Sequence, residues 1–176
     1  SLTYYYSACV GINVESLSIL CDPWFTDGAY YGSWYQYPKL IDPINKIPEY
    51  KYIYISHLHE DHLDIKFLKS YLAKWPESKI IITKRKFDYL SKILNKHGLK
   101  FLKVNSVSSK DAVANLIPYL DNNKEEIDSV LEVISFKSKY RIINLNDVPF
   151  NEVFHESIAR RPFEINCLLA GYSGAG

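Results

Sequence analysis

The side chains best suited to chemistry in this chain lie in one six-residue stretch, His57 to His62. It holds three of the five histidines of the 176-residue sequence, together with an aspartate: His57, His59, Asp61 and His62. The stretch directly follows an apolar run, residues 52–55, which is typical of a buried strand. At the end of an extended strand, positions i and i+2 point to the same side, so His57 and His59 can present two imidazoles to one ion.

Imidazole and carboxylate together favour a metal ion. Asp61 and His62 follow in the turn, where the chain no longer alternates and a second set of ligands can face the same cavity. Neutral imidazole and carboxylate suit zinc, and also manganese or iron(II), because none of these requires a thiolate. The alternative interpretation is a polar loop that contains histidines by chance. The spacing predicts a metal site.

The pattern His-x-His-x-Asp-His after a strand resembles the signature of the metallo-β-lactamase superfamily. Three further segments, in the same order as in that superfamily, are similar to the branch that includes the ascorbate-phosphate lactonases and the metal-binding domain of CMP-N-acetylneuraminate hydroxylases. They are residues 19–25, with an Asp-Pro-Trp loop, residues 142–147 and residues 167–176. The resemblance implies an α/β fold, a metallo-β-lactamase-like αββα sandwich, in one domain spanning residues 1–176. Because the family fold runs longer, we expect a fragment that is incomplete at its C-terminus.

The resemblance also implies a set of metal ligands. In the family, one metal is held by the first two histidines of the motif and a later histidine, and the other by the aspartate and the final histidine. Carried over, His57 and His59 serve the first metal, Asp61 and His62 the second, and Asp147 bridges the two. The expected cofactor is zinc, as one or two ions, with manganese or iron as alternatives.

One ligand of the first metal is not identified by the motif. Between the motif and Asp147 the only histidine is His97, whose place before Gly98 is typical of a helix C-cap. Asp128 or Glu125, in the region where the family has its later histidine, can take the place of that ligand. The alternative interpretation is that the aspartate belongs to an ordinary turn. These gaps favour an incomplete or single-metal site over a full two-metal one.

The segment from Asp22 to Glu49 is expected to matter for function. It is rich in proline, glycine and aromatic residues, and long ordered loops are often functional. Asp22 is a candidate to hold the second ring nitrogen of a ligating histidine, with a turn role before Pro23 as the alternative. The aromatic side chains can line a substrate cleft and stack on a sugar or base, or can form core or an interface instead: Trp24, Phe25, Tyr30, Tyr31, Trp34, Tyr35 and Tyr37.

Composition limits which partners and which location the protein can have. The net charge is +1, from 21 basic and 20 acidic residues, so no global field attracts nucleic acid or an anionic membrane. No apolar stretch reaches the length of a membrane span, and no charged leader followed by an apolar segment opens the chain. We expect a cytoplasmic, soluble protein with a small-molecule substrate and no nucleic-acid or membrane partner. The three cysteines are widely spaced and predict buried free thiols rather than disulfides or a cysteine-rich zinc motif.

Hydrophobic periodicity predicts alternating strands and helices around the motif. Two helices are expected, at residues 64–75, capped by Asp64, and at residues 86–97. The predicted strands are residues 3–14, 16–21, 51–55, 79–83, 99–104, 112–120, 130–136 and 140–145, with turns at 121–123 and 137–139.

The predicted function is that of a metal-dependent hydrolase. A metal-activated water attacks a lactone, ester or phosphodiester, a carbohydrate derivative among them, and Asp61 orients or deprotonates that water. One alternative is an oxidoreductase domain of the neuraminate hydroxylase type, which needs an iron–sulfur domain that no cysteine/histidine pair supplies here. The other is a non-catalytic module that has lost part of the metal site.

Overall fold

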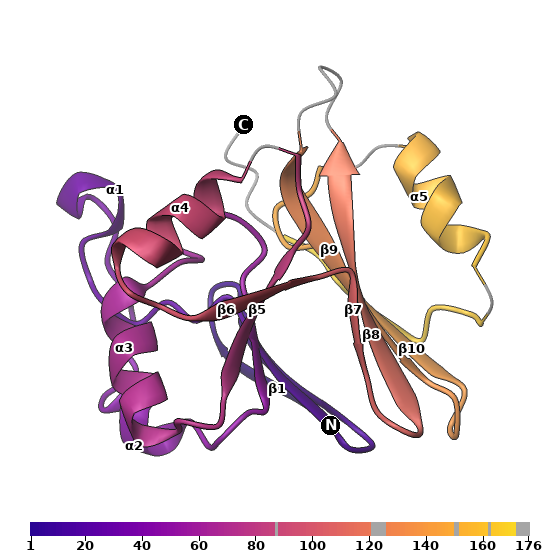
Figure 1. The fold of residues 1–176 in the computed structure, drawn as a ribbon, viewed down its shortest axis with the longest axis horizontal. Helices are drawn as coiled ribbons and strands as arrows, with labels where there is room; N and C mark the ends of the chain where they lie inside the picture. The colour runs from indigo at the N-terminus through magenta and orange to yellow at the C-terminus, as the bar shows by residue number, and fades with distance from the viewer. Residues whose placement is uncertain (87, 121–125, 150–151, 162, 172–176) are drawn as a thin grey trace. The chain divides into compact units, whose positions relative to one another are not determined.

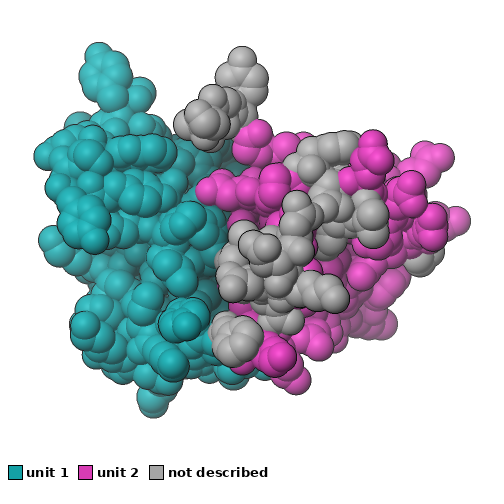
Figure 2. Space-filling view, turned by 90° about the horizontal axis from the view of Figure 1, so that it is seen from above, with its two compact units in different colours: residues 1–13, 18–82, 88–103 teal, residues 14–17, 83–87, 104–176 magenta. Residues whose placement is uncertain are grey.

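The computed structural model describes residues 1–86, 88–120, 126–149, 152–161 and 163–171. The chain divides into two compact units, which are coloured separately in Figure 2. Unit 1 comprises residues 1–13, 18–82 and 88–103, and unit 2 comprises residues 14–17, 83–87 and 104–176. Each unit is described by itself.

Unit 1 is built on a six-stranded sheet in the order β1-β2-β3-β4-β5-β6. Its strands are β1 (Leu2–Tyr6), β2 (Cys9–Val14), β3 (Leu17–Cys21), β4 (Tyr52–Tyr54), β5 (Lys79–Thr83) and β6 (Phe101–Val104). The first two strands form an antiparallel hairpin, whereas β3, β4 and β5 run parallel, with Ile53 paired to both Leu20 and Ile80. The carboxyl ends of β3 and β4 therefore meet at the same edge of the sheet, which is where ligands bind in parallel sheets.

Helices cover one face of this sheet. Two are single turns, α1 (Ala29–Gly32) and α2 (Pro43–Lys46), and two are longer, α3 (Ile65–Lys74) and α4 (Tyr89–Lys96). Figure 1 shows α3 and α4 on the same side of the strands. Their apolar faces pack on the sheet in one buried cluster that includes Leu20, Ile53, Phe67, Leu68, Tyr71, Ile80, Ile82, Leu90 and Leu94. This packing fixes the segments that enter and leave β4.

Unit 2 is a five-stranded sheet in the order β11-β10-β9-β8-β7. The elements are β7 (Ser106–Ser108), β8 (Ala112–Leu120), β9 (Glu126–Ser135), β10 (Tyr140–Asn144), α5 (Glu152–Ala159) and β11 (Cys167–Leu169). All neighbours are antiparallel except β10 and β11, which are parallel. Ile158 of α5 packs with Val130 and Ile143 of the sheet. Among the described residues, no helix combines the length and apolar character of a membrane span.

A buried ion pair joins two strands of unit 2. The side chains of Arg141 and Glu132 are 1% and 0% exposed, and Arg141 Nη2 lies 2.7 Å from Glu132 Oε1. Arg141 Nη2 also donates to the Ile158 carbonyl at 2.6 Å. The second carboxylate oxygen of Glu132 accepts from Asn115 at 2.7 Å and from Arg161 at 2.9 Å. This pair ties α5 to the sheet.

The cysteines form no disulfide: Cys9 and Cys21 are buried free thiols, as predicted, and Cys167 is half-buried. Burial, followed by the neighbouring Cys21 and Asp22, raises the pKa of the Cys9 thiol well above its ordinary value. A thiol in that state is a poor metal ligand, because the thiolate is the binding form.

Most predicted elements agree with the structure, and the α/β class is confirmed. The strands at 79–83 and 112–120 have the predicted bounds, and Asp64 caps α3. The single strand predicted for residues 3–14 is wrong, because the chain reverses at Ser7 (φ 48°) and forms the β1–β2 hairpin. The second helix begins at Tyr89 rather than at residue 86, since Asp88 accepts from the Ser91 backbone N–H and caps it. The predicted turn at 121–123 lies outside the described residues.

Removing one partner of the buried ion pair is expected to destabilise unit 2. Glu132→Leu leaves the Arg141 guanidinium buried and uncompensated, so the free energy of unfolding falls by about 3–5 kcal/mol in urea denaturation. The double variant Glu132→Leu/Arg141→Met recovers most of that loss. As a control, Glu156→Gln breaks an exposed pair with Arg160 and changes the free energy by less than about 1 kcal/mol. Equal effects of the two single variants would contradict this account.

Candidate metal centre

The histidine motif lies at the carboxyl edge of the parallel strands of unit 1. Ile55 continues β4 by donating to the Ile81 carbonyl at 3.2 Å, and Asp22 at the end of β3 donates to the Tyr54 carbonyl at 2.9 Å. After His59 the chain closes one tight turn, because His62 N donates to the His59 carbonyl at 3.0 Å. The motif is thus held between a buried strand and the start of α3.

Ring nitrogens and a carboxylate oxygen converge in this turn. His57 Nε2 lies 2.8 Å from His59 Nδ1, and His62 Nε2 lies 3.6 Å from Asp61 Oδ2. A ring nitrogen of His57 lies within 4.8 Å of one of His62. Two ligands at about 2.05 Å from a tetrahedral zinc are roughly 3.3 Å apart, so these spacings fit donor atoms that share an ion. The turn therefore brings three imidazoles and one carboxylate close together.

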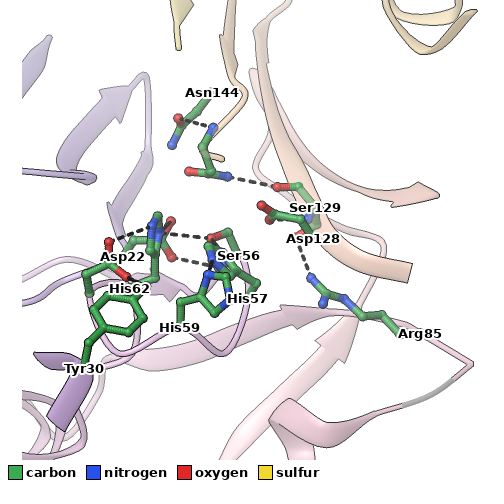
Figure 3. A network of polar contacts seen from close by, with 12 residues as sticks. Asp22, Tyr30, Ser56, His57, His59, His62, Arg85, Asp128, Ser129 and Asn144 are labelled. Carbon is green, nitrogen blue, oxygen red and sulfur yellow. Dashed lines mark hydrogen bonds and ion pairs between the residues drawn. The ribbon is translucent and has the colours of Figure 1, made fainter. Parts of the chain in front are cut away.

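The other ring nitrogens of two histidines are held by neighbouring side chains. His57 Nδ1 lies 2.9 Å from the Ser56 hydroxyl, and His62 Nδ1 lies 3.2 Å from Asp22 Oδ2 (Figure 3). Asp22 is fully buried, and its Oδ1 accepts from the Ser56 backbone N–H at 2.8 Å. A carboxylate at Nδ1 stabilises the tautomer whose Nε2 carries the lone pair, as metal-binding histidines require. The structure thus gives Asp22 the contact expected of it.

Tyr30 holds the aspartate of the motif. Its hydroxyl donates to Asp61 Oδ1 at 2.5 Å, and its backbone N–H donates to Glu60 Oε2 at 2.5 Å. Tyr30 and Tyr31 both have left-handed backbone angles (φ 54° and 59°), which cost about 1–2 kcal/mol per residue outside glycine. With Oδ1 engaged by Tyr30, Asp61 directs Oδ2 towards His62. The contact of Tyr30 with Asp61 spans 31 residues of chain, so no local pattern predicts it, and the sequence indicates only that Tyr30 can line a cleft.

Asp64 ties the Asp-Pro-Trp loop to the motif. It caps α3 by accepting from the Phe67 N–H at 2.9 Å. The same buried carboxylate accepts from the backbone N–H groups of Phe25 at 2.9 Å and Thr26 at 2.7 Å. One side chain therefore fixes both the end of the motif turn and the loop that carries Asp22.

The remaining predicted residues lie elsewhere in the chain. His97 is the exposed C-cap of α4, as predicted. In unit 2, Asp147 is exposed in the turn after β10, and Asn146 beside it is anchored by donating to the Ser129 carbonyl at 2.9 Å. Asp128 is buried in β9, whereas Glu125 lies outside the described residues. The bridging role of Asp147 stays a prediction.

Sequence comparison finds relatives among hydroxylases of a sugar nucleotide. The chain is 25% identical over 185 residues to the cytidine monophosphate-N-acetylneuraminic acid hydroxylase of Danio rerio, which covers 99% of this chain but 29% of the relative. It is 39% identical over 64 residues to a Mycobacterium tuberculosis protein named for a Rieske 2Fe-2S iron–sulfur centre, covering 36% of this chain and 12% of that protein. No protein-family model matches the chain. The chain spans less than a third of the length of these relatives.

Comparison with solved structures decides the fold. An isothiocyanate hydrolase from Delia radicum gut bacteria superposes with a TM-score of 0.65 at 13% identity, over 93% of this chain and 69% of that one. A metallo-β-lactamase fold protein from Bacillus subtilis gives a TM-score of 0.52 at 14% identity, over 84% and 57% of the two chains. The chain has the metallo-β-lactamase fold. A third structure with this fold, the short form of human tRNase Z, gives a TM-score of 0.53 at 15% identity, over 92% and 70%.

The resemblance stated from the histidine motif is therefore confirmed. Unit 1 gathers the histidine and aspartate side chains of the motif in one turn, namely those of His57, His59, Asp61 and His62. Two of the structural neighbours are named as an isothiocyanate hydrolase and as a tRNase. The hydroxylase relatives match the branch named from the Asp-Pro-Trp loop.

Replacing Asp64 is expected to cost more stability than replacing an ordinary helix cap. Asp64→Ala removes the acceptor of three backbone N–H groups, so the free energy of unfolding in urea falls by about 2–4 kcal/mol. The matched control is Asp88→Ala at α4, where the carboxylate accepts from the backbone N–H and hydroxyl of Ser91 and pairs with the exposed Lys103, and about 1–2 kcal/mol is expected. Losses of the same size at both sites would show that Asp64 acts only as a cap.

Proposed function

We propose that His57, His59, Asp61 and His62 bind metal, as one ion or two; that Asp147 bridges the two ions stays a prediction of the family resemblance. On this proposal the protein is a metal-dependent hydrolase that acts on a lactone, an ester or a phosphodiester, carbohydrate derivatives included. Zinc is the proposed metal, with manganese or iron as alternatives that the same ligands accept.

One observation carries the proposal: the convergence of His57 Nε2 on His59 Nδ1 at 2.8 Å, with the far nitrogen of His57 held by Ser56 at 2.9 Å. Ser56 holds the outer nitrogen of the buried His57 ring, as a neighbouring hydroxyl or carboxylate does for metal-binding histidines. The inner nitrogen shares a hydrogen bond with His59, which brings two donor nitrogens to one point where an ion could replace the shared proton.

Each side chain has a distinct task in the proposed reaction. A metal ion held by His57, His59, Asp61 and His62 would lower the pKa of a bound water and polarise the oxygen of the substrate. Asp61 Oδ2 orients the attacking water or accepts its proton, while the Tyr30 hydroxyl keeps Oδ1 from turning inward. Asp22 holds the His62 ring by Nδ1, so that Nε2 stays directed at the cluster. A turn packed between β4 and α3 preserves this geometry through the reaction.

The proposed substrate is a small molecule rather than nucleic acid. The net charge of +1 gives no broad field that attracts a phosphate backbone. Human tRNase Z shares the fold, so binding to an RNA is the outcome that would contradict this part of the proposal. A cytoplasmic location stays a prediction.

The relatives favour a second candidate function, that of a metal-binding domain in a larger oxidoreductase. A hydroxylase and a protein named for a Rieske centre both match this chain over a minor part of their own length. The buried Cys9 and Cys21 do not suit an iron–sulfur cluster, so such a cluster would have to be held by further chain. Cysteine and histidine pairs with Rieske spacing in the complete reading frame would favour this candidate.

Removing a proposed ligand is expected to abolish metal binding. The protein, purified without chelator, contains at least one metal ion per chain by plasma mass spectrometry, and His59→Ala lowers the metal affinity by more than about tenfold. Hydrolysis of a panel of lactones, esters and phosphodiesters is lost with EDTA and returns with zinc, manganese or iron(II). The matched control is His97→Ala, an exposed histidine of the same unit, which leaves metal content unchanged.

A metal-free protein that cannot be reconstituted would instead identify a non-catalytic module. Hydrolysis that persists in His59→Ala after chelation would contradict the proposed mechanism.

The carboxylate behind His62 is expected to tune metal affinity. Asp22→Asn keeps an acceptor for the Ser56 N–H but sets an amide against His62 Nδ1, which favours the tautomer with hydrogen on Nε2. Metal affinity, measured by competition with a fluorescent chelator, should fall by about 10–100-fold. In the same loop, Asp27→Asn breaks an exposed pair with Lys39 and serves as control, with no change expected. Equal affinities in both variants would rule out the assigned role of Asp22.

A further inference from the structure

A groove lined by aromatic side chains opens on the surface of unit 1, with a cavity volume of about 530 Å³. This aromatic groove is formed by residues of β1, the turn after it and the loop that follows β3: Tyr4, Tyr6, Ser7, Trp24, Ser33, Trp34, Tyr35 and Tyr37. The cleft predicted for the loop aromatics thus includes Trp24, Trp34, Tyr35 and Tyr37. Phe25 does not line it, because its ring packs on Phe67 in the core at 4.9 Å.

The walls of the aromatic groove are held in place by contacts that need no ligand. The Tyr6 ring meets Trp24 edge-on at 6.1 Å, and the Tyr6 hydroxyl accepts from the Tyr37 backbone N–H at 2.7 Å. Trp34 is fixed through its backbone, whose N–H donates to the Ala29 carbonyl at 3.0 Å. The Trp24 indole donates to the Thr26 carbonyl at 2.7 Å. A preformed wall loses little conformational entropy when a ligand binds.

Several rings in the groove are exposed and keep their polar ends available. Tyr4, Trp34, Tyr35 and Tyr37 are 70%, 46%, 65% and 91% exposed. Within the described part of the chain, the hydroxyls of Tyr4, Tyr35 and Tyr37 and the indole N–H of Trp34 have no hydrogen-bond partner in unit 1. Large exposed aromatics gathered in one concave place mark a binding surface, and their polar ends can serve a ligand.

The chemistry of the lining selects a neutral ligand rich in hydroxyl groups. Every lining side chain is aromatic or a serine, and none carries a charge. Lys39 of the same loop does not line the groove and pairs with Asp27 at 2.5 Å. A phosphate or carboxylate therefore finds no counter-charge here, whereas a sugar ring can lay its C–H face on an indole or phenol and exchange hydrogen bonds with the hydroxyls around it.

The aromatic groove is connected to the metal motif by one residue. The Trp34 ring packs edge-on against Tyr30 at 5.0 Å, and Tyr30 donates to Asp61 and meets the His59 ring at 6.2 Å. A ligand stacked on Trp34 therefore lies against the side chain that positions Asp61.

We propose that the aromatic groove is a saccharide-binding site that takes one or more neutral pyranose rings by stacking on Trp34, Tyr35 and Tyr37. The volume of about 530 Å³ is within the range of small-molecule sites. This site needs no metal, so it stands even where the proposed hydrolase activity fails.

Titration of ¹⁵N-labelled protein with neutral sugars tests the proposal. The probes are methyl glycosides and the trisaccharides maltotriose, cellotriose and chitotriose. Of the three tryptophans, Trp24 and Trp34 line the groove, while Trp75 ends α3 away from it and serves as an internal reference. The indole signals of Trp24 and Trp34 should shift saturably with at least one sugar, with a Kd on the order of 1 mM, while that of Trp75 stays in place.

Variants then assign the binding to the groove. Trp34→Ala and Tyr37→Ala should each weaken binding by at least about tenfold, because each removes a stacking face. Tyr31→Ala is the matched control, since Tyr31 is fully exposed, belongs to the same loop and does not line the groove. Binding should be unchanged in Tyr31→Ala and in the presence of EDTA, which separates this site from the metal site.

Three results would overturn the proposal. One is the absence of saturable binding by every sugar tested. Another is a sugar affinity that Trp34→Ala and Tyr37→Ala leave intact. The third is stronger binding of a proline-rich peptide or a free nucleoside than of any sugar, which would assign the groove to that ligand class instead.

Discussion

The carboxylate of Asp22 is the group on which the rest of the site depends. It is fully buried at the end of β3, and it accepts both the Ser56 N–H at 2.8 Å and His62 Nδ1 at 3.2 Å. Burying a carboxylate costs free energy unless its oxygens accept hydrogen bonds. The end of β4 and the motif turn supply the donors that Asp22 needs. Its left-handed backbone (φ 41°) is a strained conformation that these contacts maintain. Parallel pairing of β3 with β4 brings the groups together, and the geometry of the histidine turn follows from that register.

One loop serves two tasks in unit 1. Its first residue, Asp22, reaches the motif, and its later residues wall the aromatic groove. Asp64 anchors the loop at Phe25 and Thr26, and the Tyr30 hydroxyl anchors it again by donating to Asp61. The loop is thus fixed both at Asp64 and at Asp61, so its two ends are held by side chains of the motif turn and of the α3 cap. Such an arrangement allows related chains to change substrate by altering the exposed rings while the ligands stay fixed.

Local patterns were sufficient to predict the parts of the fold that depend on nearby residues. The strand at 79–83, the Asp64 cap and the placement of His57 beside His59 all follow from spacing within a few positions. Contacts between distant segments were harder to predict. Tyr4 and Tyr6 join the aromatic groove from β1, and no local pattern links them to Trp34. The β1–β2 hairpin was missed for a related reason, since a short turn at Ser7 carries neither glycine nor proline.

Metal-edge X-ray absorption spectroscopy of the reconstituted protein tests the central claim most directly, because it reports the ligand atoms themselves. The account predicts nitrogen and oxygen neighbours at about 2.0–2.2 Å, with the outer-shell scattering of imidazole rings and no sulfur shell. The nitrogen and oxygen shell follows from the cluster of His57, His59, Asp61 and His62. The absence of sulfur follows because no cysteine belongs to that cluster. A sulfur shell near 2.3 Å, or a metal surrounded only by water oxygens, would contradict it.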